Sequence, residues 1–318
     1  MTQMQKATRT HPSWFTRFWA IVRYEMLWNI RKKKFIAIII IAFALATIGL
    51  ALPPILSSTT GTPITANPNF AITYGASSLG FILFALATAM NSISSEFESG
   101  TIVPLLTKPV SRTMVFLGKL FAAFIIILIS YVIIFTYTTV GSIFVYGAQN
   151  NLQLVPLVLF GNLISTFIWV SILLAIGSLT KSTIITVTVV LGLFLGLFIA
   201  LPIISVFAGP SVSLNYLPGS GATGSMFVNN STLSISTGTD NLGFNLANYL
   251  LYPSATVNFS KIDFQSIQVG QTTLPTTELL YTEPVSLIAL RSLGVAFAYI
   301  LGFLFIAWYA FKRSQILE

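Results

Sequence analysis

The chain has 318 residues, of which 55% are hydrophobic and 8% are Asp, Glu, Lys or Arg, a charged fraction about a third of that in soluble domains. This composition excludes a soluble globular protein, because the polar side chains are too few to cover a folded chain in water. Sixteen basic and eight acidic residues give a net charge of +8, and the lack of cysteine excludes disulfides and thiolate chemistry. We therefore expect a multi-spanning membrane protein.

Six apolar runs are long enough to cross a bilayer as helices of about 20 residues. The sequence predicts spans at 35–56, 74–93, 120–144, 155–179, 184–206 and 293–311. The first run follows a basic cluster and lacks a small-residue cleavage site, which indicates a retained span rather than a signal peptide. The predicted fold class is an all-α polytopic membrane protein with six transmembrane helices.

The basic residues predict the orientation of this layout. They lie before the first span, between the second and third, and after the fourth and sixth, whereas only Lys261 and Arg291 fall on the opposite side. Because loops rich in Lys and Arg stay in the cytoplasm, we expect a multi-pass protein of the cell membrane with both termini cytoplasmic. The centres of the spans carry no ionisable residue, which argues against a proton- or ion-coupled carrier.

The chain divides into four predicted regions. These are a tail with an amphipathic helix (1–34), five spans with a coupling loop at 94–119 (35–206), an extracellular loop or small cap (207–284), and the last span with the C-terminus (285–318). Within the cap, 257–269 alternates imperfectly enough to suggest one or two short strands, and 245–252 suggests a short helix. Asn229, Asn230 and Asn258 begin N-x-Ser/Thr sequons, which would permit glycosylation but also arise easily by chance in such a loop.

The segment 14–31 predicts an amphipathic helix capped by Ser13 and lying flat against the inner leaflet. Glu25 and Asn29 lie one turn apart inside its apolar arc, where a carboxylate facing acyl chains would be costly. Two interpretations are open. Either this patch faces protein and Glu25 has a basic or amide partner, or Glu25 reaches the headgroups from a slightly rotated helix.

The loop between the second and third predicted spans has an unusual apolar cluster. Ser95 and Glu98 have the spacing of a capping box, Gly100 allows a sharp turn, and Thr101 is placed to cap a second short helix that Pro109 ends. That helix would carry clustered apolar residues at its tip, a shape suited to docking into a groove on a soluble partner. An ordinary solvated loop would explain the charges of the segment but not its hydrophobes.

The same loop contains the run Glu96-x-Glu98-x-Gly100-Thr101-Ile102-x-x-Leu105-Leu106-x-x-Pro109-Val110-Ser111-Arg112, followed by Gly118-Lys119. In this run the chain resembles the permease subunits of ABC exporters of the second type (ABC-2). Glu25 and Arg31, on the helix before the first span, are similar to the family's N-terminal helix. The six-span layout with both ends inside agrees over essentially the whole chain.

The resemblance implies a transmembrane permease subunit that pairs with a second copy or close paralogue and with cytoplasmic ABC ATPases. In the family this loop forms a coupling helix that passes the motion of the ATPases to the spans. The residues that the resemblance assigns to coupling are Glu96, Glu98, Gly100, Thr101, Ile102, Leu105, Leu106, Pro109 and Arg112.

The chain has no G-x-x-x-x-G-K-[ST] run, so ATP and Mg²⁺ are expected on the partner ATPase. We expect no catalytic residue, metal or cofactor in this chain and no nucleic-acid partner. The nearly uncharged spans favour lipid-like, amphipathic or polymeric cargo. Gly192 and Gly196 are expected to pack within one subunit, with a dimer seam as the alternative. The rival functions are a carrier or channel without ATPases and a membrane anchor or assembly factor.

Overall fold

The computed structural model describes residues 13–60, 68–74, 84–86, 88–89, 94–98, 110–228, 231–269 and 272–313. Within these residues, 5 helices are long and apolar enough to cross a membrane. They are α2 (Lys33–Thr60), α7 (Arg112–Tyr146), α8 (Val155–Thr180, preceded by the 3₁₀ turn η1, Leu152–Leu154), α9 (Thr183–Phe207) and α11 (Val285–Arg313). They contain five of the predicted spans, and the remaining one, 74–93, lies largely outside the described residues.

Two of these helices begin earlier than hydropathy predicts. α7 begins at Arg112 because Ser111 Oγ accepts a hydrogen bond of 3.1 Å from the backbone N–H of Met114, as an N-cap residue does. α11 begins at Val285, directly after a strand, and so contains Arg291. Hydropathy finds only the part of a helix that lies in lipid, so polar turns at the helix ends are missed.

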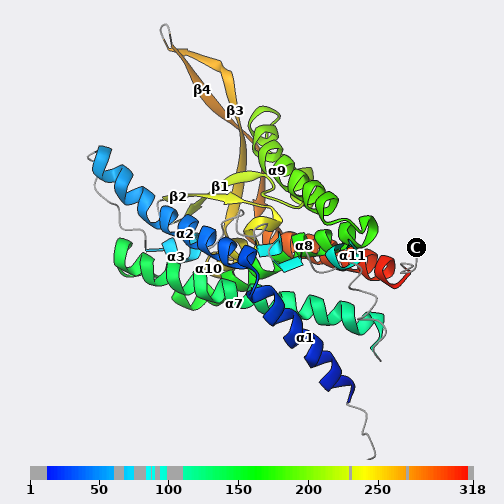
Figure 1. Cartoon of the computed structure of the whole chain (residues 1–318). Coiled ribbons are helices and arrows are strands. Elements are labelled where there is room, and N and C mark those ends of the chain that lie inside the picture. The colour runs from blue at the N-terminus through cyan, green and yellow to red at the C-terminus, as the bar shows by residue number, and fades with distance from the viewer. Residues whose placement is uncertain are drawn as a thin grey trace, which may run out of the picture.

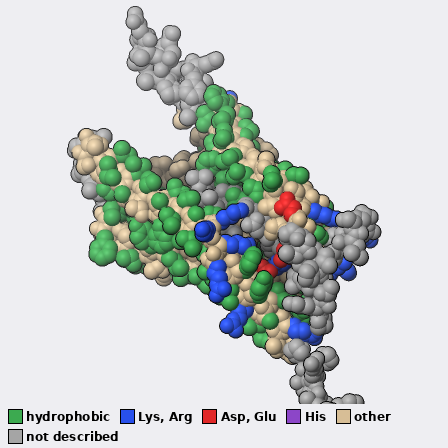
Figure 2. Space-filling model, viewed as in Figure 1, with side chains coloured by type: hydrophobic (Ala, Val, Ile, Leu, Met, Phe, Trp, Pro, Cys, Tyr) green, Lys and Arg blue, Asp and Glu red, His purple; other side chains and the backbone are tan. Residues whose placement is uncertain are grey.

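The central helix of the bundle is α8, which packs against α7, α9 and α11 (Figure 1). Most of its length is buried, including the large side chain of Trp169. In contrast, α2 and α9 turn exposed apolar side chains such as Ile40 and Ile184 outward. Figure 2 shows these hydrophobic surfaces. A helix with an apolar outer face is typical of a protein solvated by lipid.

The helices define two ends of the bundle. At the basic end, α7 begins at Arg112, α8 ends just before Lys181, and α11 ends at Arg313. At the opposite end, the cap end, α9 leads into residues 208–284 and the chain returns through α11.

The cap is a four-stranded antiparallel sheet of order β2-β1-β3-β4. The strands are β1 (Thr223–Val228), β2 (Ser231–Ser236), β3 (Thr256–Val269) and β4 (Thr272–Pro284), and the β3–β4 hairpin projects away from the helices (Figure 1). The predicted strand at 257–269 is confirmed as β3. The described spans are helical, as the all-α fold class predicts, but the cap contains four strands where the sequence suggests one or two. β2 and β4 are rich in Ser and Thr and lack the apolar alternation that reveals strands.

Part of the cap segment inserts into the bundle. The predicted short helix is confirmed as α10 (Leu242–Leu251), but it packs against α8 rather than lying outside the helices. A Cβ on Gly161 of α8 would lie 2.2 Å from the Cα of Gly243 on α10, so this close approach requires glycine on both helices. The preceding 3₁₀ turn, η3 (Thr239–Asn241), enters between α8 and α11.

Candidate functional site

The basic end brings together segments that are far apart in the sequence. Helix α1 (Trp14–Ile30) is capped by Ser13, whose Oγ accepts from the backbone N–H of Thr16 at 3.3 Å as predicted. It lies along α7, where a Cβ on Gly118 would be 2.7 Å from the Ile21 side chain. Glycine at this position therefore allows the two helices to approach closely.

A buried ion cluster joins α1, α7 and the short helix α5 (Ser94–Glu98). Lys119 Nζ lies 2.5 Å from Glu25 Oε1 and 2.6 Å from Glu96 Oε1. Lys119 is 3% exposed and Glu25 is 5% exposed. Of the two interpretations of Glu25, the structure supports the first, because its carboxylate faces protein and has a basic partner.

The charges of the cluster balance once Lys32 is included. Two carboxylates beside one ammonium leave a net negative charge. The half-buried Lys32, which lies between α1 and α2, adds a second positive charge, and its Nζ lies 3.4 Å from Asn29 Oδ1. Burial lowers the pKa of Lys32, whereas the Glu25 carboxylate acts in the opposite direction. Burial also raises the pKa of Glu96, an effect that Lys119 opposes.

Helix α5 contacts several spans although it has only 5 residues. In addition to the bond from Glu96 to α7, the Phe97 ring lies 6.1 Å from the ring of Phe311 on α11. Thr183 Oγ1, on α9, donates to Ser94 Oγ at 3.3 Å. The start of the predicted coupling loop is therefore bonded to α7 and α9, contacts α11, and is linked to Glu25 of α1 through Lys119.

Glu98 caps the N-terminus of α9. Its Oε1 accepts from the backbone N–H of Thr183 at 3.0 Å and from Ser182 Oγ at 3.1 Å. These hydrogen bonds, Thr183 foremost, lower the pKa of Glu98, and a carboxylate suits the positive end of a helix. The predicted capping box of Ser95 and Glu98 is wrong, because Ser95 lies inside α5 and the Glu98 carboxylate is used by another helix.

The other predicted site residues fall into three groups. Arg112 Nη1 donates to the backbone oxygen of Lys312 at 3.0 Å and so joins the start of α7 to the end of α11. Arg31 is exposed and lies outside the ion cluster, whereas Asn258 is exposed on β3. The predicted residues outside the described part of the chain are Gly100, Thr101, Ile102, Leu105, Leu106, Pro109, Asn229 and Asn230.

Lys119, the centre of the ion cluster, was not among the residues predicted for this site. A signal was available, because Glu25 and Lys119 are opposite charges that each interrupt an apolar surface near the same face of the predicted membrane layout. Among the described residues, nothing lies within 4 Å of a Cβ placed on Gly192 or Gly196, so the expected packing of these glycines within the subunit is not seen in that part of the chain.

The described residues contain no group of three or more His, Cys, Asp or Glu that could hold a metal ion. The described part of the site consists of ion pairs, a helix cap and ring contacts. Its ion pairs and helix cap link a short loop helix to the ends of several spans, and removing one partner of a buried ion pair is costly. A displacement of α5 would therefore be resisted by, or passed to, α1, α7 and α9.

A protein-family model matches most of the chain. No curated protein matches the chain. The sequence model of a family described as ABC-2 family transporter protein matches residues 19–316. This match runs from α1 to beyond the end of α11 and includes Glu25, α5 and Lys119. The chain therefore belongs to the ABC-2 family of transporter proteins, as a multi-pass membrane permease.

Proposed function

We propose that the chain is the permease subunit of an ATP-driven exporter and works with separate ABC ATPase subunits that bind loop 94–119 from the cytoplasm. The basic end then faces the cytoplasm, in agreement with the distribution of Lys and Arg. The observation that carries the proposal is the position of α5. This helix begins the loop that resembles the family's coupling helix, and Glu96, Phe97 and Glu98 attach it to α7, α11 and α9.

A rigid attachment of this kind is what mechanical coupling needs. An ATPase shifts the permease only if its open and closed states differ in their contacts with the loop. A flexible loop would move with the ATPase without moving the spans. The ion cluster and the helix cap hold α5 against α7 and α9, so a push on the loop would change the position of these spans.

The surface of α1 fits a position at the inner face of the membrane. Trp14 and Phe15 are 54% and 67% exposed, whereas Glu25 and Asn29 are buried against the protein. Aromatic side chains favour the headgroup layer. Under this proposal the helix lies between lipid on one side and α7 on the other.

A second copy of the chain would complete the permease. Gly192 and Gly196 leave space on the outer face of α9, and a Gly-xxx-Gly pair allows close packing of membrane helices. Under this proposal Gly192→Leu reduces the dimer fraction in mild detergent, measured by light scattering. Gly302→Leu is the control, because Gly302 on α11 also has nothing within 4 Å but lacks a partner glycine at this spacing.

Co-purification tests the assignment directly. The full chain is purified from its own membrane under mild conditions, and the ATPase subunits that accompany it are quantified. We expect stoichiometric recovery, with a fall on the order of tenfold for Leu105→Lys at the predicted tip of the loop, or about 1.4 kcal/mol of binding free energy. The matched control is Leu279→Lys on the exposed side of β4, which keeps the ATPase.

Two outcomes would contradict the proposal. One is a folded chain from which no ATPase is recovered under conditions that preserve complexes, which would favour a carrier, channel or anchor. The other is equal ATPase recovery with Leu105→Lys and Leu279→Lys. Glu96→Gln then separates coupling from binding, because it should keep the ATPase and reduce transport per ATP hydrolysed.

A further inference from the structure

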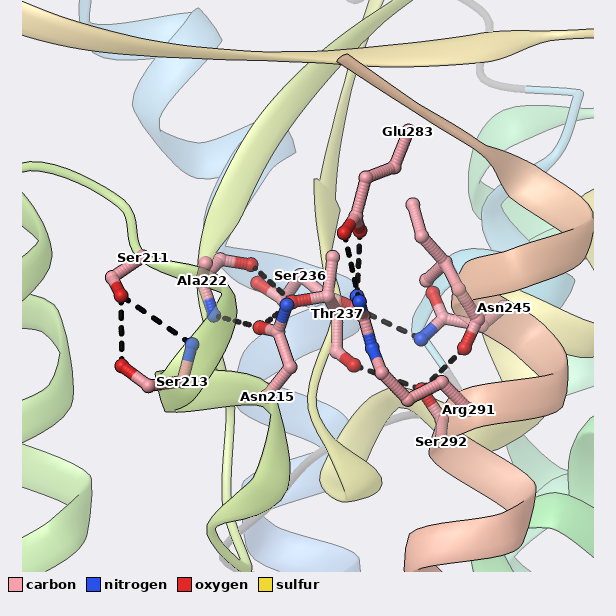
Figure 3. Close-up of polar contacts among 11 residues, drawn as sticks. Ser211, Ser213, Asn215, Ala222, Ser236, Thr237, Asn245, Glu283, Arg291 and Ser292 are labelled. Atoms are coloured by element: carbon pink, nitrogen blue, oxygen red, sulfur yellow. Dashed lines mark hydrogen bonds and ion pairs between the residues drawn. The ribbon is translucent and has the colours of Figure 1, made fainter. Parts of the chain in front are cut away.

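The segment 237–240 of the cap lies between two membrane-spanning helices. Ser292 Oγ on α11 donates to the backbone oxygen of Thr237 at 2.8 Å, and Ser165 Oγ on α8 donates to that of Thr239 at 2.6 Å. Figure 3 shows Thr237 between Asn215 and Ser292. Hydrogen bonds from both helices therefore hold the segment inside the bundle.

This insertion carries Asp240 to the middle of α8. The carboxyl lies beside Trp169, which is about 21 Å along the helix from Val155 and about 16 Å from Thr180 at 1.5 Å per residue. Asp240 is 2% exposed. The centres of the predicted spans carry no ionisable residue, but the loop inserted among the helices brings one there.

No cation of the described residues is directed at this carboxyl. Among the helices around it, α8 has no titratable residue, α7 contributes Tyr131, and α10 has only Tyr249. On α11, Arg291 is committed to Glu283 by hydrogen bonds of 2.8 and 2.6 Å (Figure 3). The remaining titratable side chain of α11 near the cap end, Tyr299, donates to the backbone oxygen of Tyr216.

The hydrogen bonding of Asp240 is also incomplete. Among the described residues, Asp240 Oδ1 has no hydrogen-bond partner. Burial raises the pKa of Asp240 to about 7, and the smaller effect of the Trp169 indole acts in the opposite direction. An unpaired carboxylate in such a place is costly, whereas the neutral acid is tolerated.

We propose that Asp240 is a proton-binding site that holds the inserted cap segment between α8 and α11, and that losing this proton drives the segment out of the bundle. When the segment moves into water, the pKa of the carboxyl returns to about 3.9. Opening of the cap end therefore releases one proton to water, and closing takes one up. This proposal does not depend on the ATPase partners and would survive the failure of that assignment.

Thermal unfolding of the purified full chain tests the site. The folded state keeps the proton that the unfolded chain loses, so wild-type stability should fall as the pH rises from about 4 to about 7 and then level off. Asp240→Asn should lack this fall, match the wild type near pH 4 and melt on the order of 5–10 °C higher at about pH 8.5. The control Glu278→Gln, at an exposed position on β4, should keep the wild-type profile.

A second measurement reads the proton without changing Asp240. Aspartate occurs only at positions 240 and 263, so carboxyl-labelled aspartate in the Asp263→Asn variant reports Asp240 alone. Its carbon-13 signal should titrate with a midpoint near 7. A carboxyl that is ionised throughout this range, or an Asp240→Asn variant that loses the same stability at every pH, would overturn the proposal.

Discussion

Two buried polar sites lie in this largely apolar protein, and they handle charge in opposite ways. At the basic end, Lys119 contacts Glu25 and Glu96, with Lys32 nearby, so positive and negative charges compensate one another. Near the middle of α8, neutral hydrogen bonds hold the inserted segment, and no cation among the described residues is directed at Asp240. The charges of the ion cluster compensate one another, whereas under our proposal the Asp240 site changes its charge by gaining or losing one proton.

The largest expected effect comes from breaking the ion cluster. Lys119→Met leaves Glu25 and Glu96 buried without their cation, and removing one partner of a buried ion pair costs about 3–5 kcal/mol. We expect a loss of this order in the free energy of unfolding, measured by denaturation in mild detergent. Lys34→Met, at an exposed position close by, is the control. The triple variant Glu25→Gln, Glu96→Gln, Lys119→Met should recover part of the loss, and an unchanged loss would show that packing, not charge, holds this site.

The next effect comes from separating α10 from α8. Gly161→Ala places a Cβ 2.2 Å from the Cα of Gly243, so the backbone must move, and we expect a cost of about 1–3 kcal/mol. Hydrogen exchange in α10 should increase with it. Gly294→Ala on α11, where nothing lies within 4 Å, should be neutral. If both variants behaved alike, the close approach of α8 and α10 would be contradicted.

A smaller effect tests the hydrogen bond that holds η3. Ser165→Ala removes the bond to the backbone oxygen of Thr239 and should cost about 1 kcal/mol. Ser171→Ala is matched in burial, but its hydroxyl bonds only within α8, to Ile168. The comparison is made by unfolding both variants at about pH 5, where Asp240 is protonated. Equal losses would mean that Ser165 does not hold the inserted segment.

The smallest effect is expected at Glu98, because this carboxylate is exposed to solvent. Glu98→Gln weakens the cap of α9 at neutral pH, since the hydrogen bonds from Thr183 lower the pKa of the carboxyl. The stabilisation by Glu98 is lost as the pH falls through that lowered pKa, so the variant and the wild type should converge in acid. Hydrogen exchange in the first turn of α9 measures the difference. A difference that persists in acid would show that the negative charge is not responsible.

Much of the basic end was predictable from local patterns. Each of three features could be predicted from residues within a few turns of one another. They are the Ser13 cap of α1, the apolar lengths of the spans and the position of Glu25 in an apolar arc. The partner of Glu25 is harder to identify, because Lys119 is 94 residues away along the chain. The position of Lys119 on the basic side of the predicted layout also has a simpler explanation in the orientation of the spans. The capping box failed for the same reason, since Glu98 serves a helix that begins at Thr183.

The sequence by itself determined that this is a multi-pass membrane protein. It also determined which ends of the spans carry the basic residues and which loop resembles the coupling helix of the ABC-2 family. Apolar periodicity and the positions of Lys and Arg suffice for this, because lipid demands the same pattern from every spanning helix. Only the tertiary structure decided that Glu25 and Glu96 share Lys119 and that a polar loop carries Asp240 into the bundle. Both features depend on contacts between residues that are far apart in the sequence. Hydropathy does not reveal such contacts, and the glycine pair that brings α8 and α10 together is one example.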